Sequence, residues 1–281
     1  MSGEFFLKEC LETVREKKPL VHNITNYVTV NDVANMILAC GASPIMADDT
    51  DEVEEITALC AGLNINIGTL NQRTIPAMLA AGKKSVSLGH ATLLDPVGAG
   101  ASRLRTETAV KLIHEIPFTA IRGNTSEIKA LASCGGRTKG VDADSADEIN
   151  EENLEQSIEF IRKVANEFHT IIAVTGAIDI VTDGSDVYVI RNGRAQMGRI
   201  TGTGCQLSGL ATAFLAANPK NHLQAMVTAV TAMGVAGEIA WLRMETGDGN
   251  IAYRGKIIDA ICNMEGNQLE AMAKIARKQG N

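Results

Sequence analysis

The sequence predicts an α/β protein of three layers, in which a mostly parallel central sheet carries helices on both faces. Short runs rich in β-branched residues alternate with longer amphipathic stretches up to about residue 175, and this alternation is typical of a parallel sheet. The chain has 281 residues, 45% of them apolar, which is enough for one large core. Because we find neither an internal repeat nor a Pro- or Ser-rich linker, we expect residues 1–281 to form a single domain.

Six candidate strands share a short apolar run bounded by turn residues, and they span residues 19–25, 43–46, 64–68, 91–97, 118–123 and 170–175. Between them lie amphipathic stretches with helical spacing, among them residues 30–39, 72–82, 104–113 and 154–168. The acidic segment 141–155 is predicted to be a solvated surface loop that leads into the last of these helices. In sheets of this class, ligands gather in the loops at the carboxyl ends of the strands.

The pattern changes after the sixth strand. Residues 179–200 alternate between apolar and polar, with turn pairs at Asp183-Gly184 and Asn192-Gly193, which predicts an antiparallel meander. Three long helices are then expected, at residues 203–217, 223–246 and 256–278. The stretch 225–242 is apolar enough to be compared with a membrane span. Its small residues and its single carboxylate favour a buried helix, so no membrane partner is expected.

Composition excludes several classes of function. The formal net charge is −7 with scattered basic residues, and aromatic residues make up only 4%, which argues against a nucleic-acid partner. The six cysteines form no CxxC pair and lack a nearby histidine at metal-ligand spacing, so we expect reduced thiols and a cytoplasmic protein. The N-terminus carries acidic residues and lacks the long apolar segment of a signal peptide.

The segment 201–205, with the sequence Thr-Gly-Thr-Gly-Cys, lies between the predicted meander and a predicted helix. Glycines let the backbone approach a ligand closely, and a helix start presents unpaired N–H groups at a positive dipole end. Both features favour an anion such as a phosphoryl group. The segment has no lysine after its glycines and lacks the GxGxxG spacing, so it is neither a P-loop nor a dinucleotide motif. From the pattern alone, a tight turn that caps a helix explains it equally well.

Cys205 ends this segment, at a position where a helix N-terminus lowers the pKa of a thiol. A thiolate there could accept the proton of a substrate hydroxyl as its oxygen attacks phosphorus. The alternative is that Cys205 is a small buried residue with a packing role.

Two further loops follow predicted strands. Asp95 begins the sequence Asp-Pro-Val-Gly-Ala-Gly and has the residue type of a metal or phosphate site. Arg122 can reach a phosphate, and Glu127 together with Asp95 could hold Mg²⁺ directly or through water. Asn124 and Glu127 also have the spacing of a helix capping box. Three such loops at three strand ends favour a phosphoryl-transfer site.

Six motifs in this order resemble those of the hydroxyethylthiazole kinase family, which has the ribokinase-like fold. They are Asn23-Ile24-Thr25-Asn26, Gly41-Ala42-Ser43-Pro44-Ile45-Met46, Asp95-Pro96-Val97-Gly98-Ala99-Gly100, Arg122-Gly123-Asn124-x-x-Glu127, Val174-Thr175-Gly176 and Thr201-Gly202-Thr203-Gly204-Cys205. The resemblance runs from about residue 19 to the C-terminal helices, so it covers nearly the whole chain.

This resemblance implies an enzyme of thiamine salvage that uses ATP and Mg²⁺ to phosphorylate 4-methyl-5-(2-hydroxyethyl)thiazole. It also implies a homotrimer with active sites between subunits. Position by position, it places substrate contacts at Asn26, Val28, Met46, Gly68 and Gly202, nucleotide contacts at Arg122, Thr175, Thr203 and Gly204, the metal region at Asp95 and Glu127, and the catalytic position at Cys205.

Many ribokinase-like enzymes carry an aspartate where this chain has Cys205. A cysteine at this position resembles the thiazole kinases, which are one family within that larger group. A thiol with an ordinary pKa of about 8.5 is mostly protonated at neutral pH. Since positioning and charge stabilisation supply most of the rate of phosphoryl transfer, we expect the backbone donors of residues 202–205, Arg122 and Mg²⁺ to matter more than proton uptake by the thiol.

Two other interpretations remain open at this point. A related vitamin kinase acting on hydroxymethylpyrimidine or pyridoxal would perform the same chemistry on another primary alcohol. A nucleotide-binding protein without catalytic activity is the alternative from another class.

Overall fold

The computed structural model describes residues 6–135 and 148–278, and over these residues nine strands form one sheet in the order β2-β1-β3-β4-β5-β6-β7-β8-β9. The strands that pair in parallel are β1 (Leu20–Ile24), β2 (Ser43–Met46), β3 (Gly62–Asn66), β4 (Ala91–Asp95), β5 (Ala120–Asn124) and β6 (Ile171–Thr175). Antiparallel pairing adds β7 (Asp179–Thr182), β8 (Val187–Ile190) and β9 (Ile275–Lys278). The sheet is therefore mixed and mostly parallel, as predicted.

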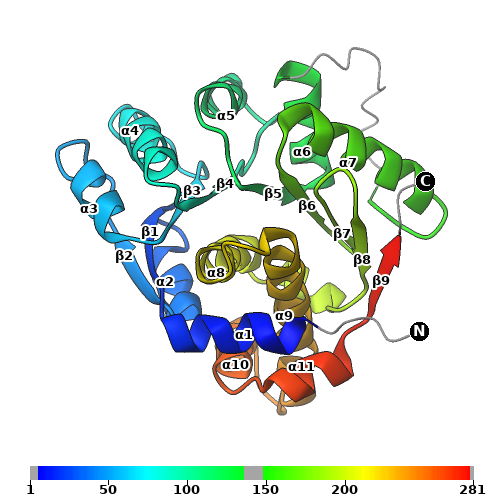
Figure 1. Cartoon of the computed structure of the whole chain (residues 1–281). Helices are drawn as coiled ribbons and strands as arrows, with labels where there is room; N and C mark the ends of the chain where they lie inside the picture. The colour runs from blue at the N-terminus through cyan, green and yellow to red at the C-terminus, as the bar shows by residue number, and fades with distance from the viewer. Residues whose placement is uncertain (1–5, 136–147, 279–281) are drawn as a thin grey trace.

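Helices cover both faces of the sheet, which curves around one of the two helical layers (Figure 1). The convex face carries α3 (Val53–Leu59), α4 (Thr74–Ser87), α5 (Arg103–Glu115), α6 (Thr125–Gly135) and α7 (Leu154–Phe168). The concave face carries α2 (Val30–Ala39), α8 (Thr203–Ala217) and α9 (His222–Leu242), backed by α1 (Leu7–Lys17), α10 (Asn250–Cys262) and α11 (Gly266–Met272). The prediction of three layers is confirmed.

The parallel strands are buried on both faces, so successive side chains enter two separate cores. In β4, Leu93 packs with the concave-face helices and Leu94 packs with the convex-face helices, and neither has any exposed surface. Strands with two buried faces read as continuous apolar runs in the sequence, which is why the pattern predicted them well.

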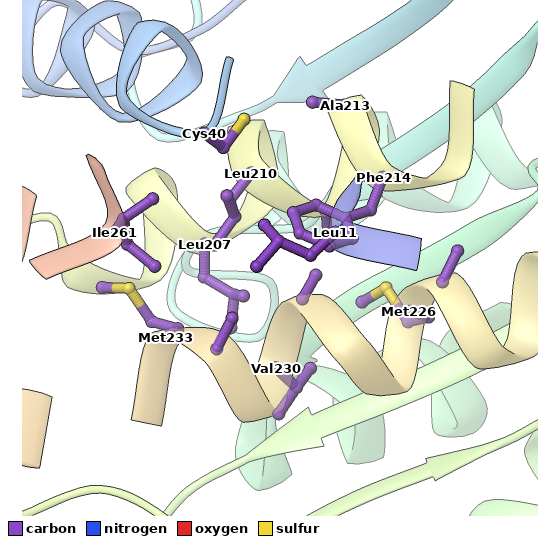
Figure 2. Close-up of a cluster of buried hydrophobic side chains, with 14 of the residues drawn as sticks. Leu11, Cys40, Leu207, Leu210, Ala213, Phe214, Met226, Val230, Met233 and Ile261 are labelled. Atoms are coloured by element: carbon purple, nitrogen blue, oxygen red, sulfur yellow. The ribbon is translucent and has the colours of Figure 1, made fainter. Parts of the chain in front are cut away.

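The helix α8 lies at the centre of the concave-face core. Leu207, Leu210 and Phe214 project from it toward α9 and α1 (Figure 2). A Cβ atom on Gly209 would lie only 2.8 Å from the side chain of Val33, so glycine allows α2 to pack closely against α8. This packing fixes the position of the α8 N-terminus relative to the sheet.

The helix α9 explains the long apolar stretch of the sequence. By length and composition it could cross a membrane, but 83% of its most apolar window is buried inside the protein. The prediction of a buried helix is confirmed.

The predicted C-terminal helix 256–278 is wrong in its second part. The chain instead forms α10, a break around Met264, the short helix α11, and the strand β9. Gly266 allows the close approach of α11 to α1, because a Cβ atom there would overlap the side chain of Lys8. Residues 275–278 have helix-forming composition, but pairing with β8 satisfies backbone groups that would otherwise remain unpaired at the edge of the sheet.

The predicted meander 179–200 is only half correct. Its first turn joins β7 and β8 and places Gly184 at a φ of +95°, but residues Ala195–Arg199 form a 3₁₀ helix instead of a third strand. The place beside β8 is taken by β9 from the end of the chain. The helix α9 also ends earlier than predicted, at Leu242 instead of residue 246.

The predicted surface loop 141–155 is described only from residue 148. Residues 148–153 form no helix or strand, and α7 begins at Leu154. The remainder of the predicted loop, 141–147, lies outside the described residues.

Candidate active site

Polar side chains gather at the carboxyl ends of β1, β3, β4, β5 and β6. Neighbouring strands are in register there, with Asn66 of β3 beside Asp95 of β4, and Asn124 of β5 beside Thr175 of β6. The N-terminus of α8 reaches the same edge, because Ser208 in its second turn donates a hydrogen bond of 2.8 Å to the Asp95 carboxylate. The three loops that the sequence places at strand ends therefore lie at one edge of the sheet.

Asp95 is completely buried beneath this edge. Its Oδ2 atom accepts hydrogen bonds from Asn66 Nδ2 and Ser208 Oγ, both at 2.8 Å, and Arg122 Nη1 lies 3.4 Å from both carboxylate oxygens. Burial raises the pKa of Asp95, whereas the Arg122 charge and these hydrogen bonds oppose that rise. The carboxylate is thus held in one orientation and in turn orients the arginine.

Arg122 connects Asp95 to the neighbouring loop. Its Nη2 atom donates to Thr175 Oγ1 at 2.7 Å, and its Nε atom is buried without a hydrogen-bond partner among the described residues. A Cβ atom on Gly204 would lie 2.6 Å from the guanidinium group, so only glycine leaves room for this arrangement. A guanidinium with spare donor capacity at a helix N-terminus is suited to bind an anion.

The thiol of Cys205 is surrounded by amide donors. Asn26 Nδ2 lies 3.2 Å from Sγ, and Asn66 Nδ2 lies 3.3 Å from it. The prediction that the helix N-terminus lowers the thiol pKa is wrong, because burial and then the nearby Asp95 carboxylate raise the pKa of Cys205. The thiol form is therefore favoured at neutral pH, and Cys205 is poorly suited to act as a base.

Asn66 is a residue of this site that sequence reasoning missed. Its amide group donates to Asp95 and Cys205, and its Oδ1 atom accepts from Asn26 Nδ2 at 3.0 Å and from the Gly68 backbone N–H at 2.9 Å. Its position near the end of a predicted strand was the available signal, since side chains at strand ends form the site in this fold class. Asn66 fixes the thiol, the carboxylate and the Gly68 loop relative to one another.

The segment 201–205 forms the start of α8. Gly202 is the N-cap residue with a φ of +87°, a conformation that favours glycine, and a Cβ atom there would overlap the methyl group of Thr29. Because the first N–H groups of a helix have no intrahelical partner, Thr203, Gly204 and Cys205 present backbone donors at this end. The segment is thus both a helix cap and a candidate anion cradle.

A pocket of about 450 Å³ opens beside this helix start. All four residues predicted to contact the nucleotide line it, namely Arg122, Thr175, Thr203 and Gly204. Its lining also includes the apolar side chains of Met197, Leu207, Val230 and Met233. A cavity of this volume with an apolar wall and a few polar groups is typical of a small-ligand site.

Asp179 also lines this pocket and was not predicted. Its Oδ1 atom accepts a hydrogen bond of 2.9 Å from the Gly176 backbone N–H, which shapes the turn between β6 and β7. Burial raises the pKa of Asp179 to about 7, although the Gly176 hydrogen bond and the Arg122 charge oppose the rise. The spacing of Gly176 and Asp179 could have indicated a turn, but no pattern in the sequence indicated the pocket.

Glu127 is the second carboxylate of the metal region expected from the sequence. Its two carboxylate oxygens accept backbone hydrogen bonds from Gly98 at 2.9 Å and Asn124 at 2.8 Å, and Asn124 Oδ1 accepts from the Glu127 N–H in return. The capping box is therefore present. Burial, and then the Asp95 charge, raise the pKa of Glu127.

The five predicted substrate contacts are brought together only in part. Asn26 and Gly68 are buried and tied to Asn66, and Gly202 packs against the Thr29 side chain, which donates to Asn26. Within residues 6–135 and 148–278, the other two predicted contacts make no side-chain hydrogen bond to this group. Met46 ends β2 and is partly buried, and Val28 is 58% exposed on the loop after β1.

Comparison with known proteins identifies the family. The model of the hydroxyethylthiazole kinase family matches residues 11–267. A hydroxyethylthiazole kinase from Clostridium acetobutylicum is 55% identical over 268 residues, which cover 95% of this chain and 98% of the relative. The chain belongs to the hydroxyethylthiazole kinase family. Another member, from Clostridium beijerinckii, is 46% identical and is matched over 98% of this chain and 99% of its own length.

Solved structures agree with membership of the hydroxyethylthiazole kinase family. The hydroxyethylthiazole kinase protein of Pyrococcus horikoshii OT3 has a TM-score of 0.86 at 35% identity, covering 98% of this chain and 99% of that one. A pyridoxal kinase from Staphylococcus aureus in complex with AMP-PCP has a TM-score of 0.62 at 14% identity, covering 93% and 98%. At this identity the likeness shows only a shared fold. The predictions of a ribokinase-like fold and of this kinase family are confirmed.

Proposed function

We propose that this chain transfers the γ-phosphoryl group of ATP to the primary alcohol of 4-methyl-5-(2-hydroxyethyl)thiazole, in thiamine salvage. The observation that carries the proposal is the continuity between two groups of residues. Arg122 lines the pocket with Thr175, Thr203 and Gly204, and it also contacts Asp95, which is bonded to Asn66 beside Cys205. A nucleotide in the pocket and an alcohol near the thiol would therefore meet at the start of α8.

In the proposed reaction, Arg122 and the backbone donors of residues 203–205 bind the γ-phosphoryl oxygens. The alcohol oxygen attacks phosphorus, the bond to the β-phosphate oxygen breaks, and ADP leaves with those electrons. Because the transition state is loose, the hydroxyl proton is lost late, to a phosphoryl oxygen of the product. The raised pKa of Cys205 fits a role in positioning the alcohol, together with Asn26, better than a role as a base.

Magnesium is proposed as a cofactor that neutralises charge on the transferring phosphates. Asp95 and Glu127 supply the oxygen chemistry that Mg²⁺ prefers. Among the described residues no group of three or more His, Cys, Asp or Glu side chains could hold a metal alone, and Asp95 is fully buried and engaged by three side chains. Asp95 and Glu127 would therefore hold Mg²⁺ only in part, directly or through water, and the metal would supply positive charge beside the phosphates.

We further propose a homotrimer in which a neighbouring subunit completes the acceptor site. Tyr27 (77% exposed) and Val28 (58% exposed) directly follow the buried Asn26. Their exposure supports this proposal, because we expect the apolar residues that line a substrate site to be covered, here by a neighbouring subunit. Light scattering after gel filtration should give three times the mass of the chain, and a monomeric mass would overturn it. The free thiols support a cytoplasmic location.

The function is tested by ADP release with three alcohols: the hydroxyethylthiazole, hydroxymethylpyrimidine and pyridoxal. We expect kcat/KM for the thiazole alcohol to exceed the other two by at least about tenfold, as pocket fit alone can provide. Preference for the pyrimidine or for pyridoxal would overturn the proposed substrate. Binding of ATP without alcohol-dependent ADP release would overturn the proposed activity.

A further inference from the structure

The wall segment, which we define as residues 192–198, forms one side of the nucleotide pocket. It follows β8 and includes most of the 3₁₀ helix Ala195–Arg199, and Asn192, Gly193, Met197 and others line the cavity. Unlike the loops at the parallel strand ends, this segment follows the antiparallel part of the sheet. Its position therefore depends on contacts with other elements.

Glu238 of α9 provides several of these contacts. Its Oε1 atom accepts hydrogen bonds from the Gly193 backbone N–H at 2.9 Å, from Asn192 Nδ2 at 3.3 Å and from Lys274 Nζ at 2.9 Å. The Glu238 side chain is only 13% exposed, whereas Lys274 is 56% exposed. One carboxylate oxygen thus joins the wall segment, α9 and the residue that precedes β9.

Asn192 ties the same segment to the C-terminal part of the chain. Its Nδ2 atom donates to the Met272 carbonyl at 2.9 Å, and its Oδ1 atom accepts from the Lys274 backbone N–H at 2.7 Å. The chain between α11 and β9 therefore supports the pocket wall from behind.

Two glycines of α9 allow the wall segment to lie directly on the helix. A Cβ atom on Gly234 would lie 2.8 Å from the backbone of Asn192, and one on Gly237 would overlap the side chain of Met197. The wall segment is therefore in close contact with α9 at two positions one helical turn apart. Glu238, next to the second glycine, accepts the hydrogen bonds that hold the segment there.

The pocket has polar residues at the α8 N-terminus and apolar residues elsewhere in its lining. Arg122, Thr203 and Gly204 gather at the α8 N-terminus, where phosphates are favoured. Met197, Val230 and Met233 line it with apolar surface, which suits the flat face of a nucleotide base. With the phosphates at the helix start, we expect the base and ribose to extend toward this apolar surface, where Met197 of the wall segment lies beside α9.

We propose that Glu238 is a positioning residue for the nucleotide, because it fixes the wall segment against which the base and ribose bind. This inference rests on the proposed use of ATP at this pocket. Glu238 touches neither the phosphates nor the acceptor in this arrangement, so its influence should be confined to nucleotide affinity. A purely structural role, in which the hydrogen bonds only satisfy a buried carboxylate, would change stability and leave nucleotide affinity unchanged.

The test uses Glu238→Gln and Glu238→Ala in the full-length enzyme. Glutamine retains an acceptor oxygen but loses the charge that pairs with Lys274. Alanine leaves the Gly193 N–H without its acceptor and leaves the Asn192 amide with only the Met272 carbonyl. We expect Glu238→Ala to raise the Kd for ADP and the KM for ATP about tenfold, and Glu238→Gln to have a smaller effect in the same direction. The kcat and the KM for the thiazole alcohol should stay within about twofold of wild type.

The matched control is Lys278→Met, which removes an ion pair of β9, from Lys278 Nζ to Glu155 Oε1 at 2.7 Å, away from the pocket. This variant should keep the wild-type Kd for ADP. A lower melting temperature with unchanged Kd for ADP in both Glu238 variants would overturn the proposal. So would an equal rise in the KM of ATP and of the alcohol. If Glu238→Ala fails to fold, the milder Glu238→Gln variant decides by the same measurements.

Failure of the inference is distinguishable from failure of the proposed function. If wild-type protein binds ADP but forms no ADP from ATP with any of the alcohols, the proposed function is contradicted. The comparison of Kd values for ADP still tests the role of Glu238. Wild-type turnover with unchanged nucleotide affinity in the variants contradicts the inference alone.

Discussion

Arg122 occupies the position between the buried Asp95 and the open pocket. One nitrogen of its guanidinium faces the carboxylate at 3.4 Å and another donates to Thr175 at 2.7 Å, while Nε has no partner among the described residues. The sequence predicted Asp95 and Arg122 because they stand where predicted strands end, and Glu127 because it follows Arg122 in the same loop and helix start. It could not predict Asn66, whose role depends on register with β4.

Asp179 gives a pH-dependent prediction at the residue scale. Its pKa is raised from an ordinary 3.8 to about 7, so the folded protein holds a proton that the unfolded chain releases between these values. The stability associated with this proton is therefore present below about pH 4 and is lost as the pH rises through about 7. Compared with Asp179→Asn, wild type should lose more stability between pH 5 and pH 8.

Urea unfolding of both proteins at several pH values measures this difference. Since all other titrating groups are shared, they cancel in the comparison. Parallel pH profiles for wild type and Asp179→Asn would contradict the raised pKa.

At the scale of elements, the junction between the Gly-rich segment and α8 positions the donors of the site. The sequence predicted this junction, because the glycines and the apolar run that follows are both local signals. Local signals failed where the partner is distant in sequence. Residues 275–278 form β9 because β8 offers an unpaired edge, and residues 195–199 turn away because Asn192 and Gly193 bond to α9 and to the C-terminal segment.

Replacement of Gly202 by alanine tests the junction. At a φ of +87°, with the Thr29 methyl group in the way, a Cβ atom should cost more than about 1 kcal/mol of stability and displace the donors. We expect a lower urea midpoint and a fall in kcat/KM of more than about tenfold.

The matched control is Gly255→Ala in the interior of α10, where a Cβ atom would meet nothing within 4 Å. Because alanine has the higher helix propensity, this variant should gain about 0.5–1 kcal/mol. Equal midpoints for the two variants would contradict the strained conformation at Gly202.

At the scale of the whole molecule, α8 and α9 lie inside the curve of the sheet and are buried along most of their length (Figures 1 and 2). The pairing of β9 with β8 and the packing of α1 on α11 bring the two ends of the described chain into one structure, which supports the proposal of a single domain. The apolar composition predicted the burial of α9, and the Gly-rich segment before α8 predicted which helix carries the site.

Phe214 tests the central position of α8. It has no exposed surface and packs in the concave-face core, so Phe214→Ala should cost about 3–5 kcal/mol of unfolding free energy. Leu242→Ala, at a site that is 77% exposed, should change stability by less than about 0.5 kcal/mol. Chemical denaturation measures both, and a similar small change in the two variants would contradict this packing.

The most direct test of the account compares Arg122→Ala with Cys205→Ser by kcat/KM for the thiazole alcohol at saturating ATP. In the proposed reaction Arg122 stabilises charge on the transferring phosphoryl group, and the Cys205 thiol, whose pKa is raised by burial, takes up no proton. Arg122→Ala should therefore lose at least about 100-fold, whereas Cys205→Ser should retain activity within about tenfold of wild type. Equal losses in the two variants, or a greater loss in Cys205→Ser, would contradict the account.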